Sequence, residues 1–159
     1  MRTAAIGVGA TALMDLWAVV LKRLFGVPSL DYGMVGRWIG HFPRGRFVQT
    51  NIAQASPVRG ERIIGWGAHY VIGIILAALL VAIAGPEWTR DPTPLPALAV
   101  GVLTVAAPFF VMQPGMGVGI AASKSPNPTM ARLRSLVAHL VFGIGLYAAA
   151  LLSTLLIRP

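Results

Sequence analysis

The chain has no cysteine and few charged residues. The absence of cysteine excludes disulfides, thiolate catalysis and cysteine-ligated clusters. Charged side chains make up 11% of the 159 residues, whereas soluble domains average about 25%. Hydrophobic residues make up 56%, so a soluble fold of this size would leave much apolar surface in water. The composition therefore favours an integral membrane protein over a very apolar soluble helical domain.

Acidic residues are also scarce. Five Asp and Glu face 13 Lys and Arg, which gives a net charge of +8. The basic residues lie between apolar runs, so the predicted partners are the lipid bilayer and its anionic headgroups, with no nucleic acid. The segment GRWIGHFPRGRF, which mixes aromatic residues with arginine, is interpreted in the same way as an interfacial segment.

Four apolar runs are each near the roughly 20 residues that a membrane-spanning helix needs. They cover residues 4–21, 63–84, 95–113 and 133–157. The first run contains Asp15 and ends at Lys22 and Arg23 without a small-residue cleavage site, so it is expected to be a retained helix. Pro108 and Pro114 are expected to bend the third run. The pattern predicts one all-α transmembrane domain over 1–159, a four-helix bundle.

The basic residues predict an orientation. Most of them lie in segments 22–62 and 114–132, whereas the connection between the second and third runs carries only Arg90. By the positive-inside rule, the loop 22–62 and the Gly-rich connection 114–132 are cytoplasmic, and both termini lie on the outer side.

Two of the apolar runs resemble each other. Residues 62–78 read RIIGWGAHYVIGIILAA and residues 132–148 read RLRSLVAHLVFGIGLYA. The shared positions include one histidine in each copy, His69 and His139, and a glycine four residues later, Gly73 and Gly143. Because both runs start at the cytoplasmic side, the chain is predicted to be two parallel-repeat helical hairpins.

Three ionisable residues lie at one predicted depth. Asp15, His69 and His139 are each about six residues, hence about 9 Å, from the cytoplasmic end of their helix. Each has small residues one turn away on the same helix face, which favours a place inside the bundle. Ionisable side chains inside a membrane mark functional sites, so these three are predicted to form one.

Four interpretations of this site stay open. Two histidines and a carboxylate suit a divalent transition metal. The same groups could relay protons, because histidine titrates near neutral pH. The two histidines could hold haem b. Alternatively, the polar groups only fasten helices, and the protein is a non-catalytic accessory or scaffold subunit in a homo-oligomer or a larger membrane complex. The residues predicted to surround this site are Thr11, Ser135, Met112, Gln113, His41 and Glu61. The third span also offers the hydroxyl of Thr104.

The stretch QPGMGVGIAASKSPNP, residues 113–128, is rich in glycine. Backbone amides in such a loop can cradle an anion, with help from Ser123 and Lys124, although the pattern ending in Gly-Lys-Ser/Thr is absent. The alternative is a pliable or re-entrant end to the third helix. Asn127 is expected to cap the fourth helix. Predicted anion or headgroup contacts are Arg37, Arg62, Lys124, Arg132 and Arg134.

Five segments, taken in order, resemble an uncharacterised bacterial family, domain-of-unknown-function family 2938. They are GATALMDLW (9–17), GVPSLDYGMVGRWIGH (26–41), GERIIGWGAHY (60–70), APFFVMQPGMGVGIAASKSPNP (107–128) and RLRSLVAHLVFGIGLY (132–147). The resemblance covers nearly the whole chain and implies a small multi-pass protein of the bacterial inner membrane. It implies no activity, so it transfers no catalytic residue.

Overall fold

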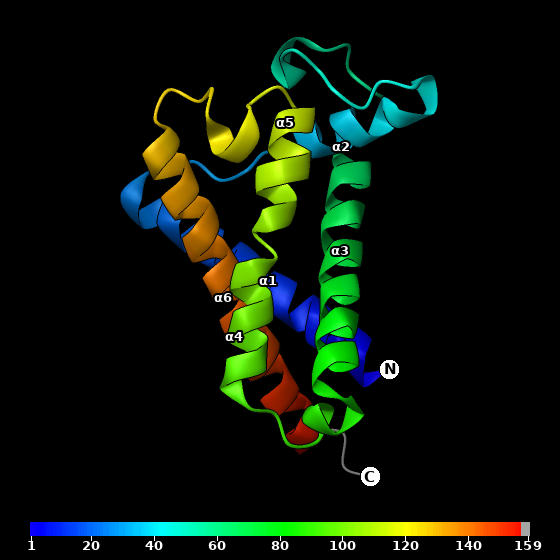
Figure 1. Ribbon diagram of the computed structural model, residues 1–159, viewed down its shortest axis with the longest axis vertical. Coiled ribbons are helices and arrows are strands. Elements are labelled where there is room, and N and C mark those ends of the chain that lie inside the picture. Colours follow the sequence, from blue (N-terminus) through cyan, green and yellow to red (C-terminus); the bar gives the residue numbers. More distant parts are fainter. Residues whose placement is uncertain (157–159) are drawn as a thin grey trace. The chain divides into compact units, whose positions relative to one another are not determined.

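The computed structural model describes residues 1–156, which form helices and turns without any strand. The long helices are α1 (Arg2–Phe25), α3 (Glu61–Ala84) and α6 (Pro128–Leu156), drawn in blue, green and orange to red in Figure 1. A further helical stretch, Pro94–Gly115, contains α4 (Pro94–Leu103), a π-helical turn η4 (Pro108–Met112) and α5 (Gln113–Gly115). All four stretches are long and apolar enough to cross a membrane, which confirms the four predicted spans. Ile157, the last residue of the predicted fourth span, lies outside the described residues.

Most residues of the spans are not buried within the protein. Only 17–28% of the most apolar window of each span is buried within the protein. Ile63, Ile83 and Leu103, for example, are exposed. Hydrocarbon is a favourable surrounding for such surfaces and water is not.

Local sequence explains where the helices begin and end. The first ends at Gly26, whose left-handed backbone (φ 66°) lets its N–H bond back to the carbonyls of Leu21 and Lys22. The last begins at Pro128, five residues before the predicted start at 133. Asn127 explains the difference and confirms the predicted cap, because its Oδ1 accepts a hydrogen bond of 3.0 Å from the Met130 N–H.

The third span is interrupted at Thr104 and Val105, where the chain makes a turn between helical segments. The turn lies shortly before Pro108, which has no N–H to donate to a preceding carbonyl. The interruption agrees with the expectation that proline distorts this span. Its π-helical turn is a feature often found near functional sites.

The chain divides into two compact units. Unit 1 contains Met1–Ser29, Tyr70–Thr104 and the described part of Leu136–Pro159. Its core is formed by side chains of α1, α3, α4, α6 and the short 3-10 helix η3 (Pro86–Thr89). Glycines allow these helices to approach closely. A Cβ on Gly73 would collide with the Thr11 hydroxyl, and one on Gly101 would lie 2.5 Å from the Cα of Gly143.

Unit 2 contains Leu30–His69 and Val105–Ser135. Much of the segment predicted as loop 22–62 is helical here, with α2 (Tyr32–Gly40) and the 3-10 turns η1 (Phe42–Arg44) and η2 (Ile52–Gln54). The glycine-rich stretch adds a third, η5 (Ile120–Ala122). Backbone hydrogen bonds from Gln49 to Gly115 (2.8 Å) and from Ile52 to Met116 (3.1 Å) join the two connections that were predicted to be cytoplasmic.

Candidate functional site

Asp15 lies on α1 in unit 1 and is partly buried. The hydroxyl of Tyr70, on α3, donates a 2.9 Å hydrogen bond to its Oδ2. Thr11, one turn before Asp15, is buried and donates to the Gly7 carbonyl of its own helix at 2.8 Å. The carboxylate thus has a tyrosine partner, whereas the predicted neighbour Thr11 serves its own backbone.

His139 lies on α6 and also belongs to unit 1. Its Nδ1 is 3.2 Å from the hydroxyl oxygen of Thr104, which is 2.7 Å from the Gly101 carbonyl. A hydroxyl has one proton, and a carbonyl can only accept, so Thr104 donates to Gly101. In this contact His139 therefore donates from Nδ1.

His69 lies on α3 in unit 2, beside aromatic rings. Its Nε2 is 2.9 Å from the Tyr32 hydroxyl, and the two rings stack with centroids 4.2 Å apart. Trp66 packs on Tyr32 from the same helix as His69, with centroids 4.5 Å apart. The imidazole therefore has an aromatic surround and a hydroxyl partner.

A glycine pair brings Tyr32 to His69. A Cβ on Gly65 of α3 would collide with the Tyr32 carbonyl oxygen, and one on Gly36 of α2 with the Glu61 carbonyl oxygen. Only glycine permits backbones to approach this closely. The start of α2 is further fixed by Asp31, whose Oδ1 accepts a 2.8 Å hydrogen bond from the Gly33 N–H.

The three residues predicted to form a site thus each have a hydroxyl partner within their own unit. Across residues 1–156, no three His, Cys, Asp or Glu side chains are gathered in a way that could hold a metal ion. Sequence reasoning noted Thr104 as a polar residue but missed Tyr32 and Tyr70. Tyr70 directly follows His69. The one sequence signal for Tyr70 as a partner was its hydroxyl group in an otherwise apolar run.

Other predicted neighbours lie in unit 2. His41 is 2% exposed, and its Nε2 donates to the Ser56 carbonyl at 3.0 Å. Nδ1 of His41 and Oε1 of Gln113 are buried without a hydrogen-bond partner in the described part of the chain. Met112 packs against the core of this unit, and Ser135 is partly buried on α6.

Arg37 and Glu61 form a bidentate ion pair. Nε and Nη2 of Arg37 donate to the two carboxylate oxygens at 2.9 and 2.8 Å. The remaining nitrogen, Nη1, reaches carbonyls of the η2 region, Ile52, Ala53 and Ala55, at 3.3–3.4 Å. The hydrogen bond to Glu61 raises the pKa of Arg37 above its ordinary value. This arginine, predicted to contact headgroups, is engaged within the protein.

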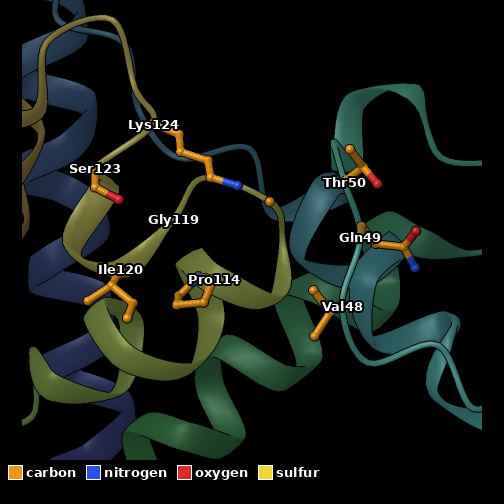
Figure 2. A pocket seen from close by; sticks show the side chains of 9 residues that line it. Val48, Gln49, Thr50, Pro114, Gly119, Ile120, Ser123 and Lys124 are labelled. Atoms are coloured by element: carbon orange, nitrogen blue, oxygen red, sulfur yellow. The ribbon is translucent and has the colours of Figure 1, made fainter.

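A pocket of about 560 Å³ opens in unit 2 between residues 48–50 and the glycine-rich stretch (Figure 2). Ser123 and Lys124, which the sequence marked as anion-binding candidates, both line it. Of the other predicted anion contacts, Arg62 and Arg134 are exposed, and Arg132 donates from Nε to the Ala121 carbonyl at 2.8 Å.

The four apolar spans define a multi-pass membrane protein. Residues 4–153 match the family described as "Protein of unknown function (DUF2938)", and the chain belongs to that family. No curated protein and no solved structure matches it. The family membership predicted from the five segments is thereby confirmed.

Proposed function

We propose that this chain is a proton-relaying protein of the bacterial inner membrane, with both termini on the periplasmic side and its four spans arranged as a bundle of two related hairpins. Asp15, His69 and His139 are the proton-carrying groups. One observation carries the proposal: each of these ionisable side chains is hydrogen-bonded to a hydroxyl of its own unit, from Tyr70, Tyr32 or Thr104.

A hydroxyl suits this role because it donates and accepts at the same oxygen. A tyrosine hydroxyl can therefore receive a proton and release its own, whereas the Thr104 hydroxyl donates to the Gly101 carbonyl and orients His139. Histidine exchanges a proton near neutral pH, and an ionisable group costs several kcal/mol in lipid unless it is paired. Hydroxyl partners lower that cost and keep a path for the proton.

The other interpretations receive less support. A metal site of three protein ligands receives less support, because no three His, Cys, Asp or Glu side chains are gathered within residues 1–156. If the same hydrogen bonds only stabilise helix packing, the contacts are identical, but their loss lowers stability without affecting proton movement. The experiment must therefore separate proton movement from stability.

The test uses purified protein in liposomes that contain a pH-sensitive dye, with a pH gradient imposed across the membrane. We expect proton flux above that of empty liposomes, and a decrease of at least about tenfold in His69→Gln, His139→Gln and Asp15→Asn. Thr104→Val should also lower the flux. Thr154→Val is the matched control, because the Thr154 hydroxyl is exposed and donates to the carbonyl of Leu151 on its own helix.

Three results would reject the relay. Flux equal to that of empty liposomes removes it outright. Wild-type flux in both histidine variants, together with a lowered unfolding temperature, assigns the pairs to fastening alone. Third, a metal ion or haem could be bound in proportion to the protein and lost in His69→Gln, as measured by metal analysis and an absorption spectrum of the same sample. That result would assign the site to the metal ion or to haem.

A further inference from the structure

The pocket of unit 2 combines apolar surface with several polar groups and one cation. Its walls come from residues 48–50 on one side and from the stretch 114–124 on the other (Figure 2). Lys124 supplies an ammonium, and Ser123 and Thr50 supply hydroxyls. No acidic side chain is among the lining residues. Such a lining favours a negatively charged ligand with several acceptor oxygens.

Bare backbone forms part of the wall. Gly117 and Gly119 adopt φ of 86° and 80°, in the region that favours glycine. A Cβ on Gly119 would collide with the Ser123 hydroxyl oxygen, and one on Gly117 with the Thr50 carbonyl. In the described part of the chain, the N–H groups of Gly119 and Ile120 have no hydrogen-bond acceptor. Backbone amides in turns of this kind bind anions.

The turn that follows is held in an unusual conformation. Ala121 and Ala122 have φ of 47° and 58°, which is costly for residues with a side chain. The Arg132 hydrogen bond to the Ala121 carbonyl fixes this turn and places a second cation next to Ile120, a pocket-lining residue.

Apolar side chains complete the pocket. Val48, Pro114 and Ile120 line it, and Val48 and Ile120 are 73% and 60% exposed. A ligand that joins an anionic head to an apolar or glycerol portion would cover them. The volume of about 560 Å³ lies within the range of about 300–1,000 Å³ that is usual for small-molecule sites.

We propose that this pocket binds a phosphate ester, with the phosphoryl oxygens at Lys124, Ser123 and the amides of Gly119 and Ile120. The shared chemistry is a tetrahedral oxyanion on an organic group. It can come from an anionic phospholipid headgroup or from a soluble phosphate ester. No lining residue of the pocket is a member of the proposed proton relay, so either proposal can fail without the other.

The chain has only two lysines, Lys124 and Lys22, and this provides a matched pair of variants. Lys124→Met and Lys22→Met remove the same charge and leave the same net charge. One arm measures binding of glycerol 1-phosphate to detergent-purified protein by calorimetry. The other counts phosphatidylglycerol retained by the protein in native mass spectrometry, against phosphatidylcholine as the neutral lipid.

In whichever arm the wild type binds, we expect Lys124→Met to weaken binding about tenfold or more, because it removes a charge-assisted hydrogen-bond donor. Lys22→Met should stay within about twofold. Binding in the lipid arm alone identifies a headgroup, and binding in the soluble arm identifies a free ester. If Lys124→Met loses its helical circular dichroism, Ser123→Ala replaces it and should weaken binding by about threefold or more.

Two outcomes overturn the proposal. The first is that wild-type protein binds neither probe. The second is that Lys124→Met and Lys22→Met weaken binding by the same factor, which would mean that binding depends on overall charge and not on this pocket.

Discussion

The ion pair of Arg37 and Glu61 allows a quantitative prediction. In Arg37→Met the two charge-assisted hydrogen bonds of 2.9 and 2.8 Å are lost, while much of the aliphatic stem is kept. Hydrogen bonds to charged groups contribute about 1.5–3 kcal/mol each. The side chains are only 16% and 21% exposed, so screening is incomplete, but desolvation offsets part of the gain. We expect a net loss of about 2 kcal/mol.

The loss should appear locally. Arg37 Nη1 reaches the carbonyls of Ile52, Ala53 and Ala55, so the η2 turn should open more often in the variant. A cost of about 2 kcal/mol corresponds to about 30-fold faster hydrogen exchange of protected amides, at about 1.4 kcal/mol per tenfold. Amides of Gln54 and Ala55, bonded to Asn51 and Ile52 carbonyls, are the reporters.

The chain contains a control ion pair. Arg90 and Glu87 are 3.0 Å apart but 70% and 76% exposed, and such pairs contribute at most about 1 kcal/mol. Arg90→Met should leave exchange at Gln54 and Ala55 unchanged. Equal exchange in wild type and Arg37→Met, or equal acceleration in both variants, would refute the reasoning.

The effect should not depend on pH in the neutral range. Pairing raises the pKa of Arg37, so its contribution is complete below the ordinary arginine pKa and is lost only as pH rises through the raised value. Both values lie far above the neutral range. The ratio of exchange rates between variant and wild type should therefore be constant from about pH 6 to 9.

Two further predictions concern packing and orientation. Gly73→Leu should lower the thermal unfolding temperature in detergent by several degrees, since overpacking costs about 1–3 kcal/mol. Gly67→Leu should leave that temperature unchanged, because a Cβ on Gly67 meets nothing within 4 Å. Equal effects of the two variants would contradict the packing described for Gly73. The chain has no cysteine, so a single introduced cysteine is a unique label. In intact cells, a thiol reagent that cannot cross the membrane should label Thr89→Cys but not Thr129→Cys, although position 129 is exposed in the structure. The reverse labelling pattern would show that the orientation is opposite to the predicted one.

The spans were predictable because length and hydropathy are properties of a single segment. The cap at Asn127 was predictable for the same reason, since it acts within three residues. The α2 helix was missed because it is short and lies in a segment dominated by arginine and glycine, where neither hydropathy nor length marks a helix. Its start depends on one side chain, Asp31.

The site was only partly predictable. Ser123 and Lys124 were identified from a local pattern, but the opposite wall of their pocket, residues 48–50, is distant in sequence and has no motif. The hydroxyl partners of Asp15 and His69 depend on which helices touch and at what rotation. Hydropathy does not specify which helices touch or how they are rotated. Close approach at glycine pairs such as Gly36 and Gly65 does specify it.

The two similar segments, 62–78 and 132–148, are more alike in packing than in polar chemistry. Gly73 and Gly143 hold the same position in the two copies, and both lie against glycine of another helix in unit 1: a Cβ on Gly7 would lie 2.6 Å from the Cα of Ile74, next to Gly73, and one on Gly101 would lie 2.5 Å from the Cα of Gly143. Small residues at these positions are required for the approach, so a larger side chain in either copy would separate the helices.

The histidines four residues earlier have different surroundings. His69 meets a tyrosine through Nε2, whereas His139 meets a threonine through Nδ1. A phenol is far more acidic than an alkyl alcohol and can itself release a proton, whereas the Thr104 hydroxyl, which donates to the Gly101 carbonyl, orients the ring. The two histidines are therefore not equivalent. Tyr32→Phe should change the pH dependence of any proton flux, whereas Thr104→Val should lower the flux without shifting that dependence.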